Sequence, residues 1–397
     1  MSKEQRVTGR REFLKQSAAT TGALTFLGGS QGQEKGKSPK NCIFLFLTGG
    51  PSQLDTFDPK PNAPEEIRGP FKAIQTKVPG MLLSETLPEM AARANRFCLV
   101  RSLNHQEAPI HETGQQLLQT GRLASGSLDH PHFGAIISSL AGGGDNAMAP
   151  FVVLPGKLGN TGVTMYQGQD AGYLGEFNSP VVVTSSRKSF RDIQSIQHPS
   201  PRRNASAVRS TLAGIKPDPR YGSSLFGEAC QAARALVEKG TRFALVNMFE
   251  TVFNEPTWDC HADGGALSTT LQDYRTRICP MFDLAFSALL DDLEEKGLLA
   301  STLVVAVGEF GRTPYLNNRG GRDHHNGVWT GILAGAGLAG GAIIGSSDDH
   351  GDEPKDQPVS PGMLAATIFK TLGYDPASLV PGTRLPLADA NPIAALA

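Results

Sequence analysis

Runs of consecutive apolar residues alternate along this chain with segments in which apolar residues recur every three or four positions. A run that is apolar throughout is typical of a strand buried on both faces, whereas the second spacing is typical of an amphipathic helix. We predict buried strands at residues 43–47, 97–100, 151–154, 242–249, 302–307, 330–334 and 342–344. We predict helices at residues 226–239, 278–297 and 363–372. This alternation indicates an α/β protein with a mostly parallel central sheet and helices on both faces.

The first 37 residues differ from this pattern and are typical of a transport signal. Arg10 and Arg11 precede Phe-Leu-Lys, a weakly apolar stretch covers 18–27, and a polar segment follows at 30–40. Paired arginines before such a stretch indicate a bacterial twin-arginine signal, and the stretch is shorter than the ~20 apolar residues that span a membrane. We therefore predict a signal peptide and polar spacer over 1–37, with cleavage around 30–37 and export by the twin-arginine translocase, to the periplasm for example. A disordered basic tail is the alternative interpretation.

The remaining chain, 38–397, is predicted to form a single domain. Residues 197–222 are rich in Pro, Arg and Ser, which indicates a surface linker or insertion within that domain. No segment after the leader is apolar enough to span a membrane, and the net charge of -1 argues against a general nucleic-acid binder. The five cysteines are scattered without CxxC spacing, so no disulfide framework is indicated.

Histidine and carboxylate side chains gather in loops that follow the predicted strands. Asp259 and His261 lie beyond strand 242–249, and they are two positions apart, so on an extended segment both side chains face one way. Asp323 and His324 follow a glycine-rich turn, and His350 lies in the acidic segment 347–353. Imidazole and carboxylate groups drawn from several loops are what a divalent metal site requires. We predict one metal centre here, with hydrogen-bonded loop residues as the alternative.

Three further candidates follow strands directly. Glu309 and Arg312 come just after strand 302–307, where a carboxylate could bind the metal and a guanidinium an anion. A structural Glu–Arg pair that shapes the turn is the alternative. Asp55 lies in the loop after the first strand and is a further candidate ligand, with a turn-forming aspartate as its alternative.

Several long motifs resemble those of one bacterial family. They are residues 49–61 (GGPSQLDTFDPKP), 258–261 (WDCH), 308–314 (GEFGRTP) and 321–325 (GRDHH). In these segments the chain resembles the family called DUF1501, whose fold is similar to the sulfatases and alkaline phosphatases. The resemblance covers nearly everything from residue 41 onward, and a twin-arginine leader is common in that family. It implies an alkaline phosphatase/sulfatase-like form of the α/β fold predicted above.

The resemblance also implies where a nucleophile would stand. Sulfatases carry a nucleophilic Cys or Ser at a helix N-terminus, nine residues before Thr-Gly-Arg. Here Thr-Gly-Arg occupies 120–122, and His111 stands nine residues earlier, so the expected hydroxyl or thiol is replaced by an imidazole. His111 could act as a base, a metal ligand or a nucleophile. The family pattern also places a last metal ligand near His350, and Arg312 would be the second contact to the substrate anion.

These observations favour an exported metal-dependent hydrolase that acts on small phosphate or sulfate esters. The replacement at the nucleophile position favours the alternative, a non-catalytic, metal-stabilised binding protein on the same scaffold. An exported redox protein is disfavoured because cofactor motifs and paired cysteines are missing from the sequence. Mixed histidine and carboxylate ligands suit Zn²⁺, Mn²⁺ or Fe²⁺ better than Ca²⁺.

Overall fold

The apolar runs of the sequence form one large sheet in the computed structural model, which describes residues 41–141, 148–162, 167–200, 205–253 and 255–396. The predicted leader, 1–37, lies outside the described residues. In order across the sheet, the nine strands are β13 (Ile343–Ile344), β4 (Phe97–Leu103), β12 (Trp329–Gly335), β9 (Thr302–Val307), β1 (Asn41–Phe46), β8 (Phe243–Asn247), β5 (Phe151–Leu154), β6 (Val181–Ser186) and β7 (Ser189–Gln197).

Most neighbouring strands in this sheet are parallel. β9, β1, β8, β5 and β6 run parallel to one another, and β13 runs parallel to β4. β12 lies antiparallel between β4 and β9, and β7 closes the other edge antiparallel to β6. The predicted α/β class with a mostly parallel sheet is therefore confirmed.

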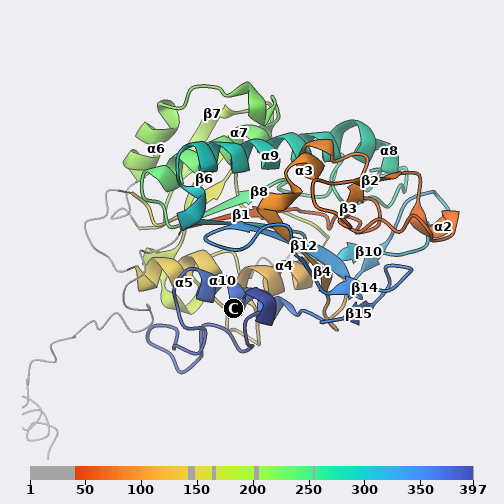
Figure 1. Cartoon of the computed structure of the whole chain (residues 1–397). Helices are drawn as coiled ribbons and strands as arrows, with labels where there is room; N and C mark the ends of the chain where they lie inside the picture. The colour runs from red at the N-terminus through yellow and green to blue at the C-terminus, as the bar shows by residue number, and fades with distance from the viewer. Residues whose placement is uncertain (1–40, 142–147, 163–166, 201–204, 254, 397) are drawn as a thin grey trace, which may run out of the picture. The chain divides into compact units, whose positions relative to one another are not determined.

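Helices cover both faces of the sheet (Figure 1). One face carries α3 (Pro88–Ala92), α6 (Ala205–Ala213), α7 (Leu225–Glu238) and α9 (Cys279–Glu295). The other face carries α4 (His111–Thr120), α5 (Phe133–Leu140) and α10 (Pro361–Thr371). The short helices α2 (Glu65–Arg68) and α8 (Leu271–Asp273) lie outside these layers, and α8 continues into a π-helical turn, η5 (Tyr274–Ile278), before α9.

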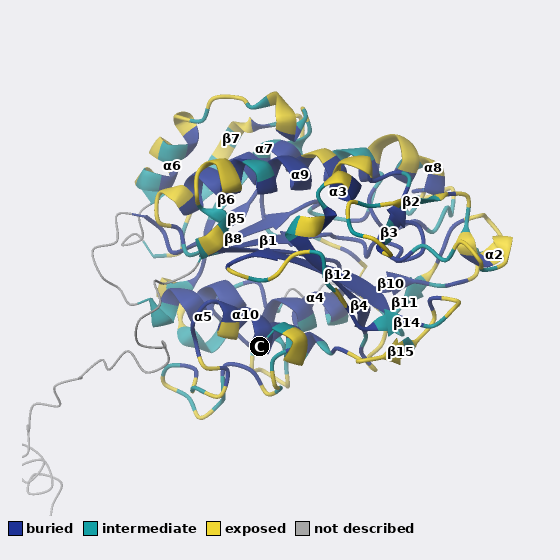
Figure 2. Ribbon diagram, viewed as in Figure 1, coloured by how far each residue is buried: buried dark blue, intermediate teal, exposed yellow. Residues whose placement is uncertain are grey.

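The core is divided in two by the sheet. In β1, Ile43 and Leu45 pack with the helices of one face, while Phe44 and Phe46 pack with those of the other. Figure 2 shows the central strands β4, β12, β9, β8 and β5 buried throughout, the edge strand β7 partly exposed, and the covering helices exposed on their outer sides. Burying such a side chain contributes roughly 1.5–3 kcal/mol, which explains why the central strands are apolar at most positions.

Three small two-stranded sheets lie outside the core. They are β2 (Ala73–Gln75) with β3 (Leu82–Ser84), β10 (Gly311–Arg312) with β11 (His324–His325), and β14 (Ser346–Ser347) with β15 (Pro354–Asp356). The β10–β11 pair places Arg312 opposite His324 and so brings two of the predicted motifs together.

The segment 197–222, predicted as a surface linker or insertion within the domain, contributes to the core. It contains α6, whose Val208 and Leu212 are buried in the core beside β7 and α7. The helix was missed because its apolar residues are mostly small: apart from three alanines, only Val208 and Leu212 stand among its Ser, Thr and Arg. Residues 201–204 of this segment lie outside the described part of the chain. Among the described residues, none of the helices has the length and hydropathy needed to cross a bilayer.

Candidate metal centre

Four strands, β9, β8, β4 and β1, end at the same edge of the sheet, and the segments that follow them supply the candidate site. β9 leads directly to Glu309, and β8 leads into the loop that carries Asp259. β4 runs in the same direction as β9, because both are antiparallel to β12, and the chain beyond β4 enters α4 at His111. This is the edge where ligands bind in open α/β sheets, since the carboxyl ends of the strands and their loops converge there.

Two glycines allow these segments to approach closely. A Cβ atom on Gly114 of α4 would lie 2.6 Å from the carbonyl oxygen of Glu309, so α4 can pack here only without a side chain. Gly49, which follows β1, has a φ of +108°, and a Cβ on it would lie 2.6 Å from the amide nitrogen of Asp259. Its amide donates to Glu309 Oε1 at 2.8 Å. The Gly49 amide thus fixes the Glu309 carboxylate, and the missing side chain of Gly49 lets the backbone of Asp259 lie beside it.

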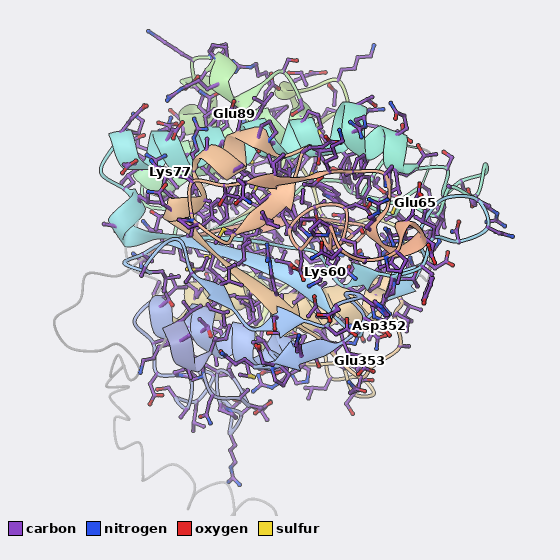
Figure 3. All side chains as sticks on the ribbon, turned by 45° about the vertical axis from the view of Figure 1, so that its right-hand side comes forward. Lys60, Glu65, Lys77, Glu89, Asp352 and Glu353 are labelled. Carbon is purple, nitrogen blue, oxygen red and sulfur yellow. The ribbon has the colours of Figure 1, made fainter. Side chains whose placement is uncertain are left out.

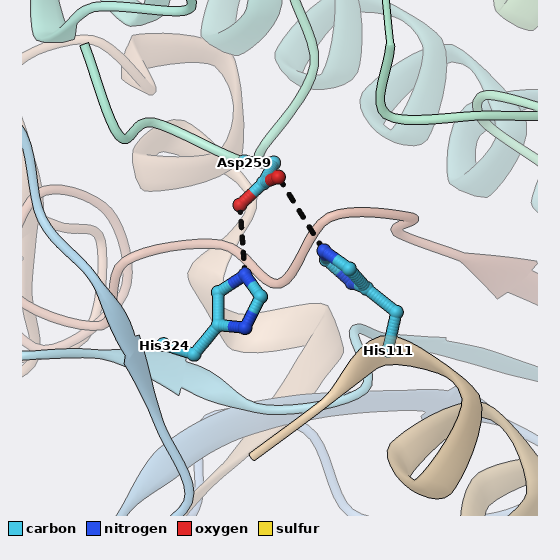
Figure 4. A group of neighbouring side chains, drawn as sticks. All are labelled: His111, Asp259 and His324. Atoms are coloured by element: carbon cyan, nitrogen blue, oxygen red, sulfur yellow. Dashed lines mark hydrogen bonds and ion pairs between the residues drawn. The ribbon is translucent and has the colours of Figure 1, made fainter. Parts of the chain in front are cut away.

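The centre of the site is the carboxylate of Asp259, which is fully buried. His111 Nε2 lies 3.4 Å from its Oδ2, and His324 Nε2 lies 3.1 Å from its Oδ1. Figure 4 shows both rings pointing toward this carboxylate from α4 and β11. One ligand-type atom from each of the three residues lies within 4.8 Å of the other two, which is close enough to hold one metal ion.

A third histidine faces the same carboxylate. His261 Nε2 lies 3.0 Å from Asp259 Oδ1, but outside hydrogen-bond geometry, so this buried nitrogen has no hydrogen-bond partner. Its ring lies 4.7 Å from that of His324, measured between centroids. His261, His324 and His111 therefore all lie around the carboxylate of Asp259, as the sequence predicted for His261 and His324.

Each of the three rings has its second nitrogen held by an acceptor. His111 Nδ1 lies 2.6 Å from Glu309 Oε1, and His261 Nδ1 lies 2.9 Å from Asp323 Oδ1. His324 Nδ1 lies 2.8 Å from the carbonyl oxygen of Pro109. Donation from Nδ1 to an acceptor is the arrangement that orients a metal-ligating histidine and leaves its Nε2 as the ligand.

The electrostatics of these residues are dominated by Asp259. Burial opposes ionisation of Asp259, but the guanidinium of Arg312 and the surrounding histidines hold its pKa well below its usual range. Burial alone would lower the pKa of His111, yet Asp259 and Glu309 raise it to about 9. Burial lowers the pKa of His324 to about 4, despite its contact with Asp259. The pKa values of the two rings that face Asp259 are thus shifted in opposite directions.

Arg312 is placed differently from its predicted role as a substrate contact. Its side chain is 0% exposed, and its guanidinium donates to Asp259 Oδ1 and to the carbonyl oxygens of Gly49, Gly50 and Arg322. In this position Arg312 neutralises and orients Asp259, because it binds the carboxylate and the loop after β1 at the same time.

Two other predicted ligands lie apart from the histidine cluster. Asp55 is buried in an ion pair with Arg322, whose Nε lies 2.6 Å from Asp55 Oδ2. His350 is exposed in the turn between β14 and β15, and Figure 3 labels Asp352 and Glu353 on the same turn. The clustered ligand atoms include neither residue.

Three residues of the site carried no role in the sequence prediction. Asn317 donates to the carbonyl oxygen of His261 and to Asp323 Oδ1, Pro109 supplies the acceptor for His324, and Arg322 binds Asp55. Arg322 lies within the GRDHH motif, next to the predicted ligands Asp323 and His324, and this position could have marked it as a site residue. The contacts of Asn317 and Pro109 depend on loops brought together by the fold.

The fold and site therefore define an α/β protein with a buried histidine–carboxylate centre at the carboxyl edge of its sheet. The chain belongs to the family described as "Protein of unknown function (DUF1501)", whose model matches residues 39–216 and 203–385. This confirms the family resemblance seen in the motifs. No curated protein matches the chain.

Several solved structures align with most of this chain at low sequence identity. A sulfatase from Pseudoalteromonas sp. is 13% identical, with a TM-score of 0.40 over 85% of this chain and 68% of the sulfatase. The alkaline phosphatase of the Antarctic bacterium TAB5 is 15% identical, with a TM-score of 0.37 over 78% of this chain and 95% of that one. The C-terminal periplasmic domain of EcEptC from Escherichia coli, in complex with Zn, is 11% identical, with a TM-score of 0.40 over 86% and 85% of the two chains.

Proposed function

We propose that this protein is an exported, metal-dependent hydrolase of phosphate or sulfate esters. The observation that carries the proposal is the set of three histidine Nε2 atoms within 3.4 Å of one buried carboxylate, each ring fixed through Nδ1. Three oriented imidazoles and a carboxylate form a donor set typical of catalytic zinc, manganese and iron sites. Export through the twin-arginine translocase is part of the proposal and rests on the N-terminal sequence alone.

The residues present fit a divalent cation. A neutral His324 that donates from Nδ1 presents its Nε2 lone pair to an anionic carboxylate oxygen 3.1 Å away, so two acceptors face each other. The unpartnered, buried Nε2 of His261 faces the same oxygen. Burying these groups without a partner costs free energy. A cation among them would be bound by the two nitrogens and the carboxylate, and would so replace an unfavourable contact with favourable ones.

His111, Asp259, His261 and His324 would hold the ion, while Glu309 and Asp323 orient two of the rings. A bound divalent ion would supply a Lewis acid that polarises an ester oxygen and lowers the pKa of a water molecule. His111 has its ring nitrogens directed at Glu309 and Asp259, which suits a metal ligand better than a free nucleophile. Arg312 keeps Asp259 ionised and in place.

The second candidate function is a metal-stabilised binding protein without catalysis. The burial of Arg312 favours it, because this guanidinium binds the protein's own carbonyl groups in place of a substrate anion. His111, at the position of the expected nucleophile, favours it as well. Among the described residues, both of its ring nitrogens contact carboxylates, those of Glu309 and Asp259, so neither nitrogen is directed at a substrate.

Elemental analysis of the purified protein tests the metal centre. We expect a stoichiometric divalent ion in the wild-type protein and its loss in the double variant His261→Ala/His324→Ala. His350→Ala is the matched control, because this histidine lies in the exposed β14–β15 turn, and its metal content should stay at the wild-type level. Full occupancy in the double variant would exclude the proposed ligand set.

Turnover of an aryl phosphate and an aryl sulfate by the metal-loaded protein separates the two functions. For a hydrolase, we expect measurable turnover that falls at least ~100-fold in His111→Ala. If the fully loaded wild-type protein hydrolyses neither ester, the binding-protein interpretation replaces the hydrolase.

A further inference from the structure

A separate cavity lies at the same edge of the sheet, beyond the carboxyl ends of β5 and β8. Its volume is about 460 Å³, and its lining comes from the β6–β7 turn, the start of α7, the end of β8 and the junction of η5 with α9. Phe226, Met248 and Phe249 form a buried apolar part of its wall. This size and apolar lining suit a small organic molecule.

The rim of this cavity carries basic side chains from two directions. Arg187 and Lys188 come from the β6–β7 turn, and Arg277 comes from η5. In the part of the chain that the structure describes, Arg277 has no ion-pair partner, whereas the neighbouring Arg275 binds Glu85. Arg187 forms no direct ion pair there, but its charge counteracts the effect of burial on the pKa of Glu250. Glu250 and Glu255 also line the cavity, so its three basic groups exceed its acidic groups by one.

The cavity wall is connected to the metal centre through Trp258. The Trp258 indole N–H donates to Met248 Sδ at 3.1 Å, and Trp258 directly precedes Asp259 in the chain. Tyr274 of η5 donates to the Trp258 carbonyl at 2.5 Å, while Thr276 and Arg277 of the same turn line the cavity. A π-helical turn is rare and occurs often at functional sites, because its wider backbone displaces side chains from their regular helical positions.

We propose that this cavity binds a small ligand with an apolar body and one anionic group, such as an aryl or alkyl sulfate, phosphate or carboxylate. The apolar body would contact Phe226, Met248 and Phe249, and the anion would lie between Arg277 and Arg187. These two guanidinium groups, neither of which forms a direct ion pair among the described residues, can supply charge-assisted hydrogen bonds to one anion. This binding goes beyond the proposed hydrolysis and does not depend on it.

The fluorescent aryl sulfonate 8-anilinonaphthalene-1-sulfonate is a suitable probe. The sequence has two tryptophans, so a Trp329→Phe protein leaves Trp258 as the only donor for energy transfer to the bound probe. We expect saturable binding at one site per chain, with quenching of Trp258. Arg277→Met should weaken binding about tenfold, the effect of losing one charge-assisted hydrogen bond. The uncharged N-phenyl-1-naphthylamine should bind more weakly than the sulfonate.

Arg209→Met is the matched control, because Arg209 is also exposed but lines a different cavity beside α6 and β7. Met281→Glu, which places a carboxylate on the wall of the proposed site, should abolish binding while circular dichroism shows an intact fold. Equal effects of Arg277→Met and Arg209→Met, or equal affinity for the neutral probe, would overturn the proposal. Metal content should be unchanged in all variants, so a failure here leaves the proposed metal centre untouched.

Discussion

At the scale of single residues, the centre depends on a few buried polar groups that fix one another. Asp259 is contacted by Arg312 and by three histidines, and Glu309 joins His111 to the amide of Gly49. Removing one member of such a network leaves another buried group without its partner, which costs more free energy than a surface contact does. The orienting residues are therefore as testable as the ligands.

Glu309→Ala should weaken metal binding by roughly 10–100-fold, the usual effect of removing a group that orients a ligating histidine. Glu309→Gln should have a smaller effect, because its amide oxygen can still accept from His111 and Gly49. The metal dissociation constant, measured by competition with a chelating dye, checks this, with Glu353→Ala on the exposed β14–β15 turn as the control. Unchanged affinity in Glu309→Ala would show that Glu309 does not orient a ligand.

His132 provides a prediction on pH. It is buried, its Nδ1 accepts from the amide of Gly134 at the start of α5, and burial lowers its pKa to about 3. The unfolded chain binds a proton here near pH 6.5 and the folded protein does not, so stability falls as the pH drops from about 6.5 toward 3, by up to about 1.4 kcal/mol per pH unit.

His132→Asn keeps a residue that can cap the helix but cannot titrate. The free energy of unfolding of this variant, from urea titrations across that pH range, should therefore depend less on pH than that of the wild-type protein. Parallel pH profiles for the two proteins would contradict the assignment.

At the scale of elements, α4 connects the core to the site. Its first residue is His111, and its Gly114 lies against Glu309, so the packing of this helix on the end of β9 sets the distance between the imidazole and both carboxylates. The rest of the helix is largely buried, which holds it in place.

Gly114→Ala should disturb both stability and metal binding. The added Cβ would lie 2.6 Å from the Glu309 carbonyl oxygen and 2.8 Å from the Glu309 Cβ, so α4 must shift away from β9. We expect a loss of roughly 1–3 kcal/mol in the free energy of unfolding, together with weaker metal binding. Gly362→Ala in α10 is the control, because the nearest atom to its Cβ would be 3.5 Å away, an ordinary contact. Urea denaturation and metal titration of both variants check the prediction, and equal behaviour would refute it.

At the scale of the whole molecule, all described residues fall within one compact unit. The single domain over 38–397 stays a prediction, and one cooperative unfolding transition of the mature protein would support it. The leader over 1–37 and its export route are likewise predictions from sequence.

Replacing Arg10 and Arg11 together by Lys should block export, because the paired arginines are the feature that defines the signal. Full-length, uncleaved protein should then accumulate in the cytoplasm, as seen by fractionation and immunoblotting. A single Lys3→Arg variant is the control and should be exported normally. Normal maturation of the double variant would exclude the twin-arginine route.

The sequence by itself determined the fold class and most of the central elements. The strand at residues 302–307 matches β9, and the predicted helix 226–239 differs from α7 by one residue at each end. These elements are predictable because burial on both faces requires continuous apolar strands, and burial of one helix face requires a regular spacing. β6, β7, α5 and α6 were missed: β7 and α6 mix polar with apolar residues and depend on their neighbours for burial.

For the site, the sequence identified the residue types, and the tertiary structure decided which of them meet. His261 and His324 both contact Asp259, whereas Asp55 forms an ion pair with Arg322, 267 positions away in the chain. Motif spacing cannot reveal such a pair, because its contact is made only when two distant loops converge at the edge of the sheet. The same convergence buries Arg312 and directs it toward Asp259, since its charge needs a buried anionic partner once the surrounding loops exclude water.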